Sequence, residues 1–297
     1  MNTSRPWRTS NNQAMADSRI INTTLIRDAI VQLIHEASFQ LHPRTRKTFI
    51  QMRDAEEPGL ARQTLDTLIV NDEIAAATQV PLCQDCGSVV VFLEIGQQVI
   101  IEGEQLNDAI QGAVAHAYEK YYLRKSIVAD PLQRVNTGTN TPSFIHIDMV
   151  PGNRLGITVY LKGGGSENMS SLHMFRPTAS EDEIIDYIVQ TVRDAGPNPC
   201  PPLFLGVGIG GTADVAMLNA KKAVLRKPGS SHPVDYYQKL EEKILRGVND
   251  TGVGPLGFGG RNTAAAVYIK EAATHIATLP VALNLNCHSL RFRGTIL

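Results

Sequence analysis

The sequence lacks an apolar run long enough to cross a membrane, and it lacks an excess of charge of either sign. No uninterrupted apolar stretch approaches the ~20 residues that a membrane-spanning helix needs. The 28 Lys and Arg residues nearly balance the 29 Asp and Glu residues, and the longest basic cluster is the short one from Arg44 to Lys47. A chain without a basic surface is a poor candidate for binding nucleic acid or an anionic membrane. We therefore expect small molecules or other proteins as its partners.

Cysteine is also scarce, with 4 residues in a chain of 297. The first twenty residues are polar and lack the apolar core of a secretion signal, so we expect residues 1–20 to form a flexible tail, with a transit segment as the alternative. Few cysteines without a secretion signal indicate a reducing compartment. We therefore expect a cytoplasmic protein whose thiols serve chemistry rather than disulfide bonds.

Hydrophobic periodicity predicts helices in the N-terminal third and strands after it. Apolar residues recur at three- and four-residue steps over 25–37, 60–69 and 106–121, and later helices are expected over 213–225 and 234–247. Ser180 and Glu183 form a capping box for another helix, which Gly196 closes. β-Branched and apolar runs predict strands over 89–95, 203–209, 264–269 and 281–285.

Alternating residues over 145–149 and 157–161 flank a turn at Pro151–Asn153, and this pattern predicts a hairpin. No composition break or internal repeat interrupts the chain after the tail. We therefore expect one large α+β domain over residues 21–297, with a helix-rich N-terminal part and a mixed β-sheet flanked by helices.

Three glycine-rich segments, KGGGSEN (162–168), GVGIGGT (206–212) and GVGPLGFGG (252–260), are read as loops that bring backbone close to something else. Gly206, Gly208 and Gly211 also match the dinucleotide motif between a strand and a helix. That motif needs a second strand ending in an acidic residue roughly 20 residues further on. The stretch found there is RKPGSSHPV, so nucleotide binding is a minor alternative, and plain tight turns are another.

The stretch PLCQDCG (81–87) has the C-x-x-C spacing of a zinc half-site, but no second half accompanies it elsewhere. A thioredoxin-like redox pair would start a helix, whereas a strand is expected to follow here. Four buried structural cysteines are the remaining simple interpretation.

The surroundings of three cysteines favour chemistry. Cys83 follows Pro81, Cys200 lies between two prolines in NPCPP, and Cys287 follows the expected strand VALNL. Such rigid, irregular segments at the ends of elements can present a side chain into a cavity. Three thiolates from separate segments can hold three corners of a [4Fe–4S] cluster. The fourth iron would then be free to bind substrate as a Lewis acid.

Several motifs, in order, resemble the iron–sulfur class I fumarate hydratase and tartrate dehydratase family, specifically the alpha subunit of its two-subunit members. The matching stretches are PLCQDCG, VNTGTNTP (135–142), KGGGSENMS (162–170), NPCPP, GVGIGGTAD (206–214), KKAVLR (221–226), GVGPLGFGG and VALNLNCHSLRFRG. They extend over nearly all of residues 21–297. The resemblance implies a hydro-lyase that uses a [4Fe–4S] cluster.

The resemblance also implies a set of site residues. The implied cluster ligands are Cys83, Cys200 and Cys287, the general acid–base is Asp85, and the substrate contacts are Gln84, Arg124, Gly164 (through its backbone) and His275. The chain departs from the family at Cys86, where threonine is usual. This leaves open whether Cys86 is silent or competes as a ligand.

The family's single-chain members continue into a second domain that is absent here, so the resemblance implies a separate beta subunit and an α2β2 assembly. Reversible hydration of fumarate to L-malate is the leading expectation for the reaction. An L(+)-tartrate dehydratase alpha subunit giving oxaloacetate is the alternative. A non-catalytic protein stabilised by zinc or by a cluster is the alternative from a different class.

Overall fold

The computed structural model describes residues 18–297 and confirms the α+β class. The chain divides into two compact units, unit 1 (18–35, 89–159 and 293–297) and unit 2 (36–88 and 160–292), and passes four times from one to the other. Neither unit is a continuous stretch of sequence. The single domain expected over residues 21–297 stays a prediction. The expected tail lies outside the described residues as far as residue 17, and Arg19 and Ile20 begin the first strand.

Unit 1 combines helices with a four-stranded sheet. Its elements are β1 (Arg19–Asn22), α1 (Thr23–Phe39), β2 (Ser88–Gly96), β3 (Val99–Glu102), α4 (Leu106–Lys120), β4 (Phe144–Val150), β5 (Leu155–Lys162) and β10 (Arg291–Ile296), some of which continue into unit 2. The sheet has the order β10-β5-β2-β4, and β1 pairs separately with β3. The helices expected over 25–37 and 106–121 are confirmed as α1 and α4.

The expected hairpin in this unit is wrong. β2 lies between β5 and β4, and β4 pairs with β2 in parallel, from Val90 opposite Phe144 to Gly96 opposite Val150. Alternation along a strand shows which residues share a face, but it does not show which strand lies alongside. β2, the most apolar strand of the unit, takes one of the two interior positions, and both of its faces are covered.

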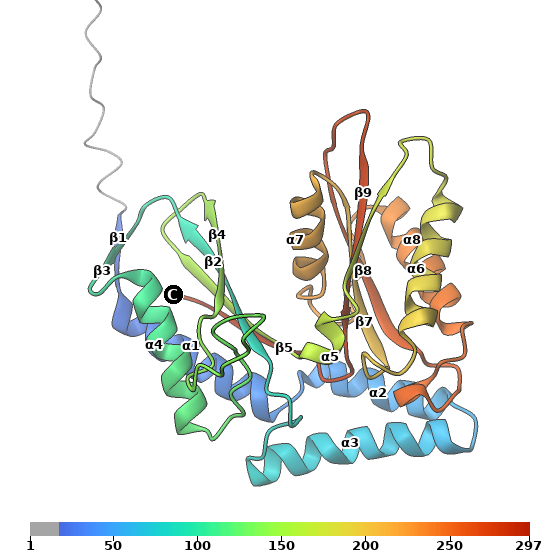
Figure 1. Ribbon diagram of the computed structural model, residues 1–297, viewed down its shortest axis with the longest axis horizontal. Coiled ribbons are helices and arrows are strands. Elements are labelled where there is room, and N and C mark those ends of the chain that lie inside the picture. Colours follow the sequence, from blue (N-terminus) through green and yellow to red (C-terminus); the bar gives the residue numbers. More distant parts are fainter. Residues whose placement is uncertain (1–17) are drawn as a thin grey trace, which may run out of the picture. The chain divides into compact units, whose positions relative to one another are not determined.

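Unit 2 is built around a second four-stranded sheet in the order β6-β9-β7-β8. Its strands are β6 (Ser171–Phe175), β7 (Leu203–Gly210), β8 (Ala264–Ala272) and β9 (Leu279–Asn286). β7 runs parallel to β8 and antiparallel to β9, so the sheet is mixed. Helices α6 (Glu181–Ala195) and α8 (Asp235–Asn249) cover one face, and α7 (Ala213–Ala223) covers the other (Figure 1).

The glycines of β7 explain how α7 can lie on the sheet. Leu203, Leu205 and Val207 belong to the apolar core formed with α6 and α8. Gly206 and Gly208 alternate with them and face α7, where an added Cβ would lie 2.0 Å from the carbonyl oxygens of Ala220 and Ala216 respectively. The close approach expected at this motif is confirmed, and it serves helix packing.

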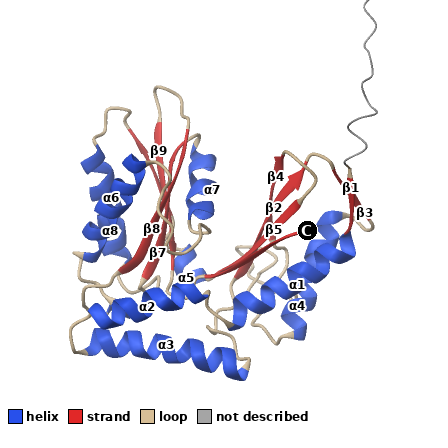
Figure 2. Ribbon diagram, turned by 180° about the vertical axis from the view of Figure 1, so that it is seen from behind, coloured by secondary structure: helices blue, strands red, loops and turns tan. Residues whose placement is uncertain are grey.

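Helices α2 (Pro43–Ala55) and α3 (Leu60–Thr78) lie side by side in unit 2 (Figure 2). The polar α2 was not expected from periodicity, although Pro43 at its first position and the cap from His42 mark its start. The capping box of Ser180 and Glu183 is confirmed at α6. KGGGSEN, expected as a loop, instead forms the short helix α5 (Gly164–Glu167), and Pro255–Gly257 is a 3₁₀ turn.

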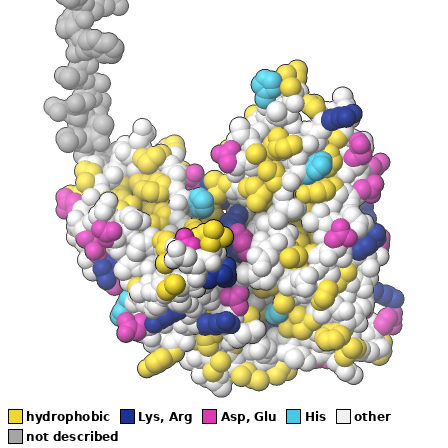
Figure 3. All heavy atoms as spheres, in the orientation of Figure 1, with side chains coloured by type: hydrophobic (Ala, Val, Ile, Leu, Met, Phe, Trp, Pro, Cys, Tyr) yellow, Lys and Arg dark blue, Asp and Glu magenta, His cyan; other side chains and the backbone are white. Residues whose placement is uncertain are grey.

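Among residues 18–297, no helix is long and apolar enough to span a bilayer. On the face seen in Figure 3, basic and acidic side chains are interspersed, as the balanced composition predicts.

Candidate functional site

Cys200 and Cys287 come together because β7 and β9 are antiparallel. Phe204, at the start of β7, lies opposite Asn286, at the end of β9. Cys200 precedes β7 and Cys287 follows β9, so both lie at the same edge of the sheet of unit 2. The backbone N–H of His288 donates to the Cys200 carbonyl over 3.1 Å, and His288 Nδ1 lies 3.1 Å from the same oxygen.

Cys83 belongs to the same group of thiols. Partial burial raises the pKa of the Cys200 thiol, although the residue as a whole is exposed, and the neighbouring Cys287 and Cys83 raise it further. Burial also raises the pKa of Cys287, while Arg291 and Lys162 act in the opposite direction. None of the three forms a disulfide. The structure therefore gathers three thiols from segments that are far apart in the sequence, next to two cationic side chains.

Asp85 is fixed beside this group by hydrogen bonds from three segments. Its Oδ2 accepts the Gly164 N–H at 2.7 Å, and its Oδ1 accepts the Gly87 N–H at 3.0 Å. Arg291 Nη1 donates to the Asp85 backbone carbonyl over 2.7 Å. The expected site residues Asp85 and Gly164 are thus adjacent. The Gly164 N–H, which we expected to face a substrate carboxylate, here binds Asp85.

Gln84 and Cys86 differ in exposure. The Gln84 side chain is exposed, and its Oε1 lies 3.7 Å from Cys83 Sγ. Cys86 is 3 % exposed, and its Sγ lies 3.9 Å from the Cys83 carbonyl oxygen. Gln84 is therefore accessible beside Cys83, whereas Cys86 is buried.

Two buried cations at this site, Lys162 and Arg291, were not singled out from the sequence. Each is 1 % exposed. The sequence gives little signal for either residue: Lys162 is the last residue of the apolar strand β5, and Arg291 follows Cys287 by four residues. Burial of a charge is costly, so full burial of both points to a role at this place.

His275 is not brought to the cysteines within this chain. It is exposed and lies between β8 and β9, whereas Cys287 follows the other end of β9. A strand of 8 residues such as β9 is roughly 26 Å long. His275 instead lines a separate cavity of about 480 Å³ with Met174, Thr212 and Thr278 among others. Its role as a substrate contact stays a prediction.

Arg124 belongs to unit 1, where it is exposed on the segment after α4. The motif VNTGTNTP folds this segment: Asn140 is fully buried, and its Oδ1 accepts the Ser126 N–H at 2.7 Å. The loop that carries Arg124 is therefore ordered by the motif's own polar side chain.

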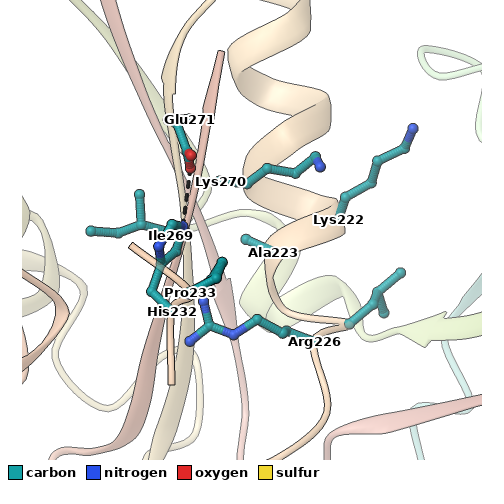
Figure 4. Close-up of a pocket in the computed structure, with 9 residues that line it drawn as sticks. Lys222, Ala223, Arg226, His232, Pro233, Ile269, Lys270 and Glu271 are labelled. Atoms are coloured by element: carbon teal, nitrogen blue, oxygen red, sulfur yellow. Dashed lines mark hydrogen bonds and ion pairs between the residues drawn. The ribbon is translucent and has the colours of Figure 1, made fainter. Parts of the chain in front are cut away.

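A further cavity, of about 410 Å³, lies beside the end of α7 (Figure 4). Two of the side chains that line it, His232 and Arg226, have acidic partners. His232 Nε2 lies 3.1 Å from Glu271 Oε2, and Arg226 makes two hydrogen bonds of 2.8 Å with Glu241. These two pairs hold His232 and Arg226 in place without a ligand.

The donor set at the cysteine edge fits an iron–sulfur cluster better than a single ion. In the described part of the chain, no group of three or more His, Cys, Asp or Glu residues is arranged to hold one metal ion. The zinc alternative therefore gains no support. Thiolates that bind a cubane cluster each hold a different iron, so they need not converge on one point. Two buried cations nearby suit an anionic group.

Comparisons with known proteins identify the family of the chain. A family model described as fumarate hydratase (fumerase) matches residues 27–295. A protein of Methanocaldococcus jannaschii with the provisional name L(+)-tartrate dehydratase subunit alpha is 39 % identical over 269 residues, covering 88 % of this chain and 94 % of that protein. The L(+)-tartrate dehydratase subunit alpha of Escherichia coli O157:H7 is 33 % identical over 251 residues, covering 83 % of this chain and 82 % of the relative.

Proposed function

The chain belongs to the family of iron–sulfur fumarate hydratases, and on that basis we propose that it is the alpha subunit of an L(+)-tartrate dehydratase. Proteins of this family are hydro-lyases, which add water to a carbon–carbon double bond or remove it. Fumarate was our leading expectation from the sequence. The relatives compared are named as tartrate dehydratase subunits, so the comparisons favour the alternative.

The observation that carries the proposal is that Cys200 and Cys287 lie at one edge of the sheet. Cys83 is close enough to raise the pKa of both thiols, and the Asp85 carboxylate is held on the same loop as Cys83. Cys83, Cys200 and Cys287 would hold a [4Fe–4S] cluster. When bound, such a cluster would supply an iron without a protein ligand, which acts as a Lewis acid towards substrate oxygens. Cys86 is buried and is not assigned as a ligand.

The chain's own residues would handle the proton. Dehydration of tartrate removes a proton from a carbon next to a carboxylate and a hydroxyl from the neighbouring carbon, and the resulting enol becomes oxaloacetate when its proton moves from oxygen to carbon. Asp85 is the residue we assign to the proton transfer, because its carboxylate is held in one orientation by the Gly164 and Gly87 N–H groups. Gln84, exposed on the same loop, would orient the substrate.

A separate beta subunit would complete the site. The relatives are named as alpha subunits, which implies a beta subunit in those enzymes. We extend this to the present chain and propose an α2β2 assembly in which Arg124 and groups of the beta subunit bind the substrate carboxylates. His275 would act as a substrate contact only through a neighbouring chain, since its own chain holds it at the other end of β9.

The test is anaerobic co-expression of the chain with the product of an adjacent reading frame, followed by iron and zinc analysis and assays on L(+)-tartrate, fumarate and mesaconate. We expect iron and sulfide, an air-sensitive visible absorbance, and the highest kcat/KM with L(+)-tartrate. Asp85→Asn should retain the cluster and lower kcat by about 10²- to 10⁴-fold. Stoichiometric zinc without iron would defeat the proposal.

Fumarate hydratase is the second candidate, favoured by the description of the matching family model. Both reactions add or remove water next to a carboxylate of a four-carbon diacid, so the same Asp85 and the same three thiols would serve either one. A higher kcat/KM with fumarate than with L(+)-tartrate would replace the first candidate by this one.

A further inference from the structure

Lys162 is an unusual residue for its position. It ends β5, is 1 % exposed, and has a side chain with no exposed surface. Its Nζ donates to Ser166 Oγ over 2.8 Å and to the Leu285 carbonyl over 2.5 Å. A methionine would fill such a space without the cost of burying a charge. The ammonium therefore needs a reason beyond packing.

The contacts of Lys162 connect three segments of the cysteine site. Ser166 lies in α5, the helix whose first residue, Gly164, binds Asp85. Leu285 lies in β9, two residues before Cys287. The backbone carbonyl of Lys162 accepts the Ser88 hydroxyl at 3.3 Å, just after the loop that carries Cys83 and Asp85. An added Cβ at Gly87 would lie 2.8 Å from that carbonyl oxygen, so the loop rests directly on it.

The charge of Lys162 is only partly balanced by acidic side chains. Glu167 Oε2 lies 3.7 Å from Lys162 Nζ, while Glu167 Oε1 is held at 2.6 Å by Lys221 Nζ. One carboxylate thus serves two ammonium groups. Burial lowers the pKa of Lys162 to about 8, while Glu167 and Cys287 act to raise it. The Lys162 ammonium, bonded to the Leu285 carbonyl, lies at the end of β9 that precedes Cys287.

We propose that Lys162 is a positioning residue of this site, whose buried ammonium fixes α5 against the end of β9 and supplies counter-charge to an anionic iron–sulfur cluster bound by Cys83, Cys200 and Cys287. This inference rests on the proposed function. Each thiolate adds a negative charge, and reduction adds one more, so a nearby cation stabilises the reduced cluster more than the oxidised one. Lys162 therefore raises the reduction potential of the cluster.

The test compares Lys162→Met, Lys162→Arg and the matched control Lys221→Met in the anaerobically purified complex. Lys221 shares Glu167 with Lys162, but its side chain is 20 % exposed. The readouts are cluster content per chain, the midpoint potential from a titration followed by electron paramagnetic resonance, and the melting temperature. We expect Lys162→Met to lower the potential and the cluster content, Lys162→Arg to restore the potential at least in part, and Lys221→Met to shift it much less.

Glu167→Gln tests the same inference if Lys162→Met does not fold. It removes the negative charge beside Lys162, so the potential should move in the opposite direction, upwards. If the wild type binds a cluster and the folded variants show the same midpoint potential, the inference is wrong and the proposed function stands. A wild-type complex that takes up no iron–sulfur cluster overturns the proposed function and, with it, the inference.

Discussion

Gly164 donates its backbone N–H to the Asp85 carboxylate over 2.7 Å, although 79 residues separate the two in the sequence. This bond joins the glycine helix α5 to the loop that carries Cys83. Two motifs that look independent in the sequence therefore form one structure. The geometry of Asp85 depends on the glycines as much as on its own loop.

Gly163→Ala should disturb this arrangement while Gly164→Ala should not. An added Cβ at Gly163 would lie 3.2 Å from Asp85 Oδ2 and 3.5 Å from Arg291 Nη2, whereas at Gly164 the nearest atom, Asp85 Oδ2, is 3.7 Å away. Since small displacements of a reacting group slow catalysis strongly, we expect kcat of Gly163→Ala to fall about tenfold or more. Steady-state kinetics of the two variants measure this, and equal effects would contradict it.

Cys83→Ser and Cys86→Ser should separate the two cysteines of PLCQDCG. Cys83 is partly exposed and close enough to Cys200 to raise the pKa of its thiol, whereas Cys86 is 3 % exposed. We expect the first variant to lose the cluster and the second to keep it. Iron and sulfide analysis after anaerobic purification decides the matter, and the reverse pattern would make Cys86 the ligand.

Gly208→Ala should destabilise the fold without touching the site. Its added Cβ would lie 2.0 Å from the Ala216 carbonyl oxygen, which belongs to the backbone of α7 and cannot rotate away. Overpacking of this kind lowers the free energy of unfolding by about 1–3 kcal/mol. Because the neighbouring atom belongs to the backbone, we expect the loss to lie near the upper end of this range. Chemical unfolding gives the free energy, with Gly164→Ala as the control. An unchanged midpoint would show that α7 can shift at no cost.

Lys162 should make the free energy of unfolding increase with pH. Burial lowers the pKa of its ammonium from 10.5 to about 8, so between these pH values the unfolded chain holds a proton that the folded chain has released. The free energy of unfolding contributed by this group therefore rises with pH across that window. The full pKa difference corresponds to roughly 3 kcal/mol.

The measurement is urea unfolding of the cluster-free chain and of Lys162→Met between about pH 7 and 10.5, the upper limit being the ordinary lysine value. The wild type should gain stability relative to the variant as the pH rises. Lys221→Met, which keeps Lys162, should behave like the wild type. If the difference in unfolding free energy between the wild type and Lys162→Met stays constant or falls as the pH rises, the lowered pKa of Lys162 is wrong.

Local patterns in the sequence predicted local structure well. The capping box of Ser180 and Glu183 and the closing Gly196 mark α6, because these groups bond within a few residues of one another. Periodicity located α1, α3 and α4 for the same reason. The short α5 and the polar α2 were missed, since neither has a clear apolar stripe.

The sequence by itself determined most of the long helices and apolar strands, the residue types available for chemistry and, through the order of its motifs, the family. The tertiary structure alone decided which of these residues meet. Cys200 joins Cys287 because β7 and β9 are antiparallel, and the same pairing puts His275 at the opposite end of the sheet. β2 separates β4 from β5, and Lys162 is buried beneath the site. Hydrogen bonds within a turn follow from neighbouring residues, whereas strand partners are selected by burial over the whole chain.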